Sequence, residues 1–156
     1  ATVKEYGHFL RHDALYAAKA ERISAMTRDI SEVIEAEFAR IGPRPGKSGK
    51  RVAFQVPCSL QHGQSIRGVT ERLLERAGFE LAPVPDAHLC CGSAGSYSLL
   101  QPELSERLLR NKLSALASGE PELIVTANIG CLAHLQTGTE LPVKHWIVAL
   151  DERLSG

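Results

Sequence analysis

Four cysteines are the residues of this 156-residue chain whose type and spacing could do chemistry: Cys58, the adjacent Cys90 and Cys91, and Cys131. His134 follows Cys131 by three residues, so one helical turn could present both side chains to one ligand. Thiolates ligate zinc and iron–sulfur clusters, and they attack disulfides. The set is therefore interpreted in four ways: an iron–sulfur site, a structural zinc site, a thiol–disulfide enzyme using Cys90 and Cys91, or buried apolar thiols.

Each cysteine segment follows an apolar run typical of a strand. The runs cover residues 51–56, 79–84 and 123–126, and helical patterns separate them. Such a βαβαβ order predicts a parallel sheet, in which the loops at the carboxyl ends of the strands share one edge. We therefore expect all four thiols to meet at that edge, in loops and away from any inward helix face.

The remaining patterns complete a small α/β fold. Helices are predicted over 63–77 and 103–117, a helical turn over 131–135, a short strand over 141–144 and a closing helix over 146–154. In the helix over 103–117 the inward residues are predicted to be Leu104, Leu108, Leu109, Leu113 and Leu116. The predicted fold class is α/β, a small doubly wound, mainly parallel sheet of about four strands with flanking helices and an N-terminal helical arm.

The chain divides into three predicted parts: the helical arm over 1–41, a proline- and glycine-rich linker over 42–50, and the cysteine-rich α/β domain over 51–156. The arm is expected to be helical from residue 3 to about 40, with a break at a capping Asp13. Its apolar stripe from Leu15 to Phe38 predicts packing on the α/β domain or on a neighbouring chain.

Bulk composition excludes several classes of protein. The formal net charge is zero and no basic block occurs, so no nucleic-acid partner is expected. No apolar stretch approaches the roughly 20 residues of a membrane helix, and four unevenly spaced cysteines do not make a secreted disulfide scaffold. We expect a cytoplasmic protein or one peripheral on the inner face of the cell membrane. The first residue is Ala1, which indicates a piece of a longer protein.

The spacing of the cysteines favours a cluster over a single zinc ion. Structural zinc sites normally use two closely spaced ligand pairs, whereas this chain has one, Cys131 with His134. Neighbouring sulfurs such as Cys90 and Cys91 can hold different irons of one cluster. The small residues of 92–96 leave backbone N–H groups free to donate to sulfur.

Three segments together resemble the cysteine-rich "CCG" domain: VPCSLQHG over 56–63, CCGSAGSY over 90–97 and TANIGC over 126–131. This domain is shared by heterodisulfide reductases and by the iron–sulfur subunits of glycolate, lactate and anaerobic glycerol-3-phosphate oxidation. The resemblance is greatest to the carboxy-terminal part of glycolate oxidase iron–sulfur subunits. It extends to the opening VKEYG over 3–7 and to VKHW over 143–146, and so covers nearly the whole chain.

The resemblance implies an iron–sulfur electron-transfer part of a glycolate-oxidising oxidoreductase, distinct from the flavin subunit that oxidises the substrate. Its implied partners are the flavin-containing subunit, the remainder of the same iron–sulfur subunit with its ferredoxin-like part, and, indirectly, the quinone pool. An air-exposed preparation is expected to be empty or to hold zinc, because ligand thiols must lose protons as metal binds.

The resemblance also implies a ligand set, in which no residue is a catalytic acid, base or nucleophile. The cofactor ligands are Cys58, Cys90, Cys91 and Cys131, and His134 is a further metal-ligand candidate, with His62 and His145 as outer candidates. The family pattern ends in Cys-x-x-Cys, whereas this chain has His134 at the last position. That departure predicts a four-cysteine [4Fe–4S] site, or one with an added histidine, in place of a five-thiolate cluster.

Overall fold

The structure, a computed structural model, describes residues 1–41 and 49–155. Most of the predicted linker, residues 42–48, lies outside the described residues. Within the described ranges the strands form one four-stranded sheet in the order β2-β1-β3-β4, and every neighbouring pair is parallel. The strands are β1 (Arg51–Gln55), β2 (Glu80–Leu81), β3 (Leu123–Thr126) and β4 (Val143–His145). The predicted α/β class with a parallel sheet is confirmed.

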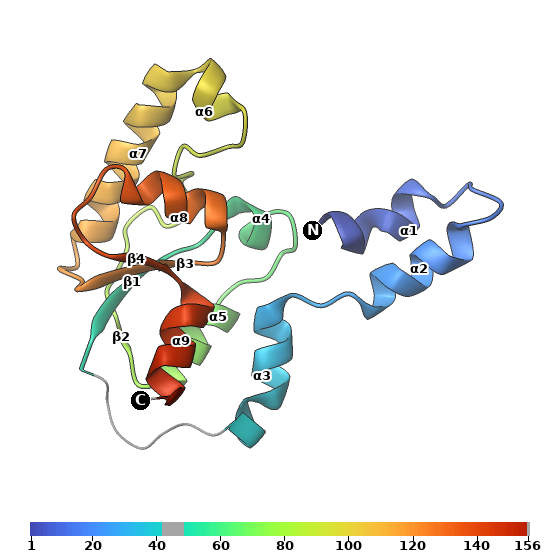
Figure 1. Ribbon diagram of the computed structural model, residues 1–156, viewed down its shortest axis with the longest axis horizontal. Helices are drawn as coiled ribbons and strands as arrows, with labels where there is room; N and C mark the ends of the chain where they lie inside the picture. Colours follow the sequence, from blue (N-terminus) through green and yellow to red (C-terminus); the bar gives the residue numbers. More distant parts are fainter. Residues whose placement is uncertain (42–48, 156) are drawn as a thin grey trace.

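Helices cover both faces of the sheet (Figure 1), as expected for a doubly wound fold. They are η1 (Thr2–Glu5), α1 (Tyr6–Phe9), α2 (Ala17–Met26), α3 (Ile30–Ile41), α4 (Cys58–Gln61), α5 (Val69–Arg76), α6 (Tyr97–Leu100), α7 (Pro102–Ala117), α8 (Ile129–Gln136) and α9 (Trp146–Ser155). Among the described helices none is both long and apolar enough to cross a lipid bilayer.

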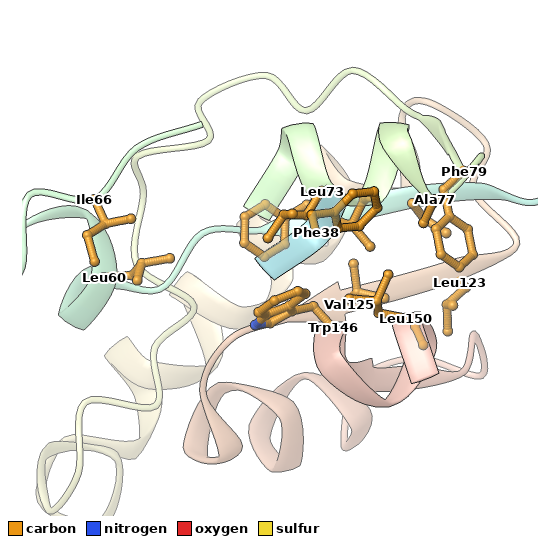
Figure 2. Close-up of a cluster of buried hydrophobic side chains, with 14 residues drawn as sticks. Phe38, Leu60, Ile66, Leu73, Ala77, Phe79, Leu123, Val125, Trp146 and Leu150 are labelled. Atoms are coloured by element: carbon orange, nitrogen blue, oxygen red, sulfur yellow. The ribbon is translucent and has the colours of Figure 1, made fainter. Parts of the chain in front are cut away.

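One face of the sheet packs against α3, α5 and α9. Figure 2 shows this core, in which Phe38, Leu73 and Trp146 surround side chains from alternate positions of the strands. Those strand residues include Phe54 and Val125. Because successive strand residues point to opposite faces, Ala53 and Ile124 belong to the second core, under α7 and α8. Cys91 and Cys131 lie in that second core.

The second strand is shorter than predicted. The apolar run over 79–84 predicts six strand residues, but β2 contains only Glu80 and Leu81. Pro83 and Pro85 interrupt the following segment, and proline has no N–H to donate to a neighbouring strand. The residues after Leu81 therefore leave the sheet early and form the long approach to Cys90.

Helix formation after β1 also differs from the prediction. The expected turn over 59–62 is the short helix α4, and the expected helix over 63–77 begins only at Val69. Ser65 and Gly68 both have positive φ, 56° and 72°, which a continuous right-handed helix does not allow. The chain therefore bends twice between α4 and α5.

The N-terminal arm is not one continuous helix. Asp13 accepts hydrogen bonds from the N–H groups of Leu15 and Tyr16, and Asp29 accepts one from Ser31. Glu32 accepts in return from the N–H of Asp29 and completes a capping box at the start of α3. The break at Asp13 was predicted; the one at Asp29 was not, although its Asp-x-x-Glu spacing signals it.

The apolar stripe of the arm is divided between solvent and core. Leu15, Ile23 and Met26 are exposed, so this part of the stripe does not pack on the α/β domain. Packing on a neighbouring chain, the other predicted possibility, stays a prediction. Phe38 on α3 is fully buried in the first core and carries the Arg76 guanidinium over its ring at 4.1 Å. Lys4 joins η1 to α3 through an ion pair of 2.6 Å with Glu32.

Candidate metal centre

The carboxyl ends of β1 and β3 are held side by side and deliver two of the cysteines. Gln55 pairs with Thr126 across the two strands, and the buried Thr126 hydroxyl donates to Gln55 Oε1 at 2.6 Å. Cys58 then opens α4 directly after Pro57. Cys131 lies inside α8, where its N–H donates to the capping side chain of Asn128 at 3.1 Å.

The Cys90–Cys91 pair lies in the loop between β2 and α6. The N–H of Gly92 donates to Cys90 Sγ at 3.3 Å, and the N–H of Ser93 donates to the Cys91 sulfur. Gly92 has φ of 92°. A Cβ on it would lie 2.4 Å from the carbonyl oxygen of Ser105 on α7. Glycine is therefore required here for both the backbone conformation and the close approach to α7.

The structure brings all four thiols together in two hydrogen-bonded pairs. Cys58 donates to Cys90, and Cys131 donates to Cys91. Cys91, Cys90 and Cys58 all contribute to raising the pKa of Cys131, so the two pairs lie near one another. None of the four forms a disulfide. Cys90 and Cys91 are adjacent in sequence, but Cys90 pairs with Cys58 and Cys91 pairs with Cys131.

Burial of the thiols is uneven. Cys58 is exposed and Cys90 is half-buried, whereas Cys91 and Cys131 are buried, the last inside a helix. The prediction that all four lie in loops is therefore wrong for Cys131, and also for Cys58, which begins α4. The site is therefore most accessible to solvent at Cys58 and least accessible at the Cys91–Cys131 pair.

The buried pair shares one proton. The S–H of Cys131 donates to Cys91 and lowers the pKa of Cys91 to about 6 against the opposing effect of burial. The N–H of Ser93 and the nearby His134 lower this pKa further. Donation to Cys91 raises the pKa of Cys131, and burial and the charge of Cys91 add to that rise. Cys91 is thus the thiolate of the pair at neutral pH, and Cys131 retains its proton.

At the open end, burial raises the pKa of Cys58, and the charge and hydrogen bond of Cys90 raise it further. Four thiols at one edge therefore do not all ionise without a cation. Within residues 1–41 and 49–155, no three His, Cys, Asp or Glu side chains gather closely enough to hold a single metal ion. The donor set consists of soft sulfurs from three segments in two pairs, supported by backbone N–H groups, which suits a multi-iron guest.

His134 lies beside the buried thiol pair. Its Nε2 is 3.2 Å from Ser105 Oγ, and Ser105 also donates to the carbonyl oxygen of Gly92 at 2.8 Å. The other two candidate histidines, His62 and His145, have different neighbours. His62 is exposed with its Nε2 at 2.9 Å from Gln61 Nε2, and the Nδ1 of His145 accepts from the N–H of Ile147 at 3.4 Å.

Two polar residues of the site were missed by the sequence reasoning. Ser105 and Lys112 lie on the inner face of α7 and are buried, together with Leu109 and Leu116. Leu104, predicted to point inward, is exposed. The spacing 105, 109, 112, 116 is that of one helix face, so two polar residues in phase with buried leucines were the available signal.

Comparisons with known proteins match the part of the chain that holds the four cysteines. A family model described as a cysteine-rich domain, CCG, matches residues 52–136. The chain is 48% identical over 155 residues to the glycolate oxidase iron-sulfur subunit of Escherichia coli (strain K12), an alignment that covers 99% of this chain and 37% of that protein.

Other relatives include the probable glycolate oxidase iron-sulfur subunit of Bacillus subtilis (strain 168), 32% identical over 90% of this chain and 32% of that protein. Lactate utilization protein A of Geobacillus kaustophilus (strain HTA426) is 26% identical over 98% of this chain and 66% of that protein. The chain spans less than two thirds of the length of each of these relatives.

Proposed function

Since the chain belongs to the cysteine-rich CCG domain family, we propose that it is the cluster-binding part of an iron–sulfur electron-transfer subunit. One observation carries this proposal. Four thiols from three segments far apart in sequence converge at the carboxyl edge of the parallel sheet, where open α/β folds bind their ligands. Isolated buried thiols, each filling space in the core, would not need this convergence.

The proposed ligands are Cys58, Cys90, Cys91 and Cys131, and the proposed cofactor is a [4Fe–4S] cluster. Such a cluster supplies reversible one-electron transfer when bound. The chain contributes negative sulfur ligands and the N–H groups of Gly92 and Ser93, which donate to two of those sulfurs. His134 is proposed as a fifth ligand or as a close donor, because it lies beside Cys91 and shares Ser105 with the cysteine loop.

The proposed setting is a complex that oxidises glycolate. Two relatives carry the name glycolate oxidase iron-sulfur subunit, and their names support an oxidoreductase role. In this proposal electrons pass from a flavin-containing subunit through this domain and the remainder of the same subunit toward a quinone acceptor. The complex would then operate in the cytoplasm or peripherally on the inner face of the cell membrane.

Anaerobic reconstitution tests the proposal. Incubation of the full chain with iron and sulfide should give a brown protein with about four irons per chain and a thiolate-to-iron absorption band. Cys91→Ser should lose most of this iron. Binding of one zinc per chain without iron uptake would instead support a structural zinc module. A metal-free protein that cycles between thiols and a disulfide would support a thiol–disulfide enzyme.

The same preparation tests His134. His134→Ala should weaken iron retention by about ten- to a hundredfold, which is typical for loss of a ligand or of a residue that orients one. His134→Cys should lower the reduction potential, because thiolate ligation gives lower potentials than histidine ligation. The control is His12→Ala, which removes an exposed histidine from the arm. Equal iron content and potential in all three variants and the parent would leave the four cysteines as the complete ligand set.

A further inference from the structure

A buried lysine lies under the cysteine loop without a carboxylate partner. The Lys112 side chain is only 1% exposed, and its Nζ donates to the carbonyl oxygen of Ala87 at 2.8 Å. Across residues 1–41 and 49–155, no carboxylate forms an ion pair with it. Lysine is almost never fully buried unless its charge is paired. The unpaired position therefore requires an explanation.

The groups whose ionised forms act on Lys112 are the four thiols. Burial lowers the pKa of Lys112, and the charges of Cys91, Cys58, Cys90 and Cys131 oppose that shift. Ala87, which accepts its hydrogen bond, precedes Cys90 by only three residues. The ammonium group is thus attached to the base of the loop that carries two of the sulfurs.

Helix α7 makes a second hydrogen bond to the same loop, from Ser105, which lies about two helical turns before Lys112. Ser105 donates to the carbonyl oxygen of Gly92, on the far side of Cys90 and Cys91 from Ala87. The inner face of α7 therefore hydrogen-bonds to the cysteine loop on both sides of Cys90 and Cys91. Lys112 donates to Ala87, and Ser105 donates to Gly92. The hydrogen bond from Ser105 comes from a neutral group, whereas the one from Lys112 comes from a group that can carry a positive charge.

We propose that Lys112 is a positioning residue whose buried positive charge balances the anionic sulfur site and raises the reduction potential of the cluster bound there. This inference rests on the proposed iron–sulfur function. Reduction adds a negative charge to the site, and a fixed positive charge in a poorly solvated interior stabilises the reduced form more than the oxidised one. The alternative role, purely structural, would be anchoring of the loop through Ala87.

Three variants separate the charge from the hydrogen bond. Lys112→Met removes both, Lys112→Gln removes the charge and keeps an N–H donor, and Lys112→Arg keeps the charge. Arg110→Met is the matched control, because it removes one positive charge from the exposed side of the same helix. Each variant of the whole 156-residue chain is reconstituted anaerobically, and the cluster potential is measured by a spectroscopic redox titration.

The expected result is a lower potential in Lys112→Met and Lys112→Gln, and a potential near that of the parent in Lys112→Arg and Arg110→Met. In the cluster-free proteins, Lys112→Met should melt at or above the temperature of the parent, because it removes a buried charge that lacks its partner. A purely structural lysine would give lower melting temperatures and unchanged potentials.

Either of two outcomes would overturn the inference. One is an unchanged potential in a folded Lys112→Gln or Lys112→Met protein. The other is unfolding of both charge-removing variants, which would make Lys112 a structural residue. Failure of the proposed function is a separate result, since the parent protein itself would then take up no iron.

Discussion

At the scale of single residues, the Cys91–Cys131 pair has one proton for two sulfurs. Because the pKa of Cys91 is about 6, raising the pH of the reduced, metal-free protein should convert Cys91 to the thiolate below neutral pH, whereas an ordinary thiol ionises at pH ~8.5. Ultraviolet thiolate absorbance should therefore rise by one group between about pH 5 and pH 7.

Two variants check the source of that shift. Cys131→Ala removes the S–H donor, so the step should move upward toward the ordinary thiol value, whereas Cys131→Ser keeps a hydroxyl donor and should move it less. Absence of any thiolate below about pH 8 in the parent protein would contradict the proton-sharing arrangement.

At the scale of elements, the contact between the cysteine loop and α7 depends on Gly92. Gly92→Ala would place a Cβ 2.4 Å from the Ser105 carbonyl oxygen and would strain a residue with φ of 92°. Each effect alone typically costs about 1–3 kcal/mol of unfolding free energy. Denaturant unfolding of the metal-free protein should show a loss within the sum of these ranges.

Gly95→Ala is the control for the steric part of that loss. Gly95 also has positive φ, 59°, but a Cβ there would meet nothing within 4 Å. Its substitution should therefore cost only the backbone strain and should leave iron uptake intact. Equal losses in the two variants would show that the approach of the loop to α7 is not tight.

The elements that could be predicted from sequence are those with an unambiguous local pattern. The strand over 123–126 and a closing helix beginning at Trp146 were predicted with these bounds, because apolar continuity and flanking turn residues agree there. The two-residue β2 was overestimated, since hydrophobicity alone does not reveal that Pro83 ends the pairing. Positive φ at Ser65 likewise has no sequence signature.

The candidate site was predictable in part for a related reason. Strand ends in a parallel sheet converge by topology, so the meeting of Cys58, Cys91 and Cys131 follows from the strand order. The pairing of the sulfurs, the place of Ser105 and the burial of Lys112 depend on how α7 packs. That packing is a three-dimensional property, and one sequence only hints at it through helical phase.

At the scale of the whole molecule, α3 packs with the α/β core, unlike the exposed helices before it. Phe38→Ala should destabilise the protein by about 3–5 kcal/mol, because it empties a fully buried position in the first core. Phe9→Ala makes the same change at a side chain that is 62% exposed, and should cost far less. Thermal or denaturant unfolding compares the two, and similar losses would contradict this division of the arm.

The pairing of β1 with β3 also sets the order of events during synthesis. During translation Cys58, Cys90 and Cys91 are synthesised well before Cys131. The β1–β3 pairing, which brings Cys58 and Cys131 to one edge of the sheet, forms only after β3 has been synthesised. Such non-local parallel pairing forms late compared with local helices. Until then the nascent chain carries only three of the four proposed sulfur ligands. In the proposed function, iron delivery therefore follows translation of the domain, once α8 with Cys131 has formed.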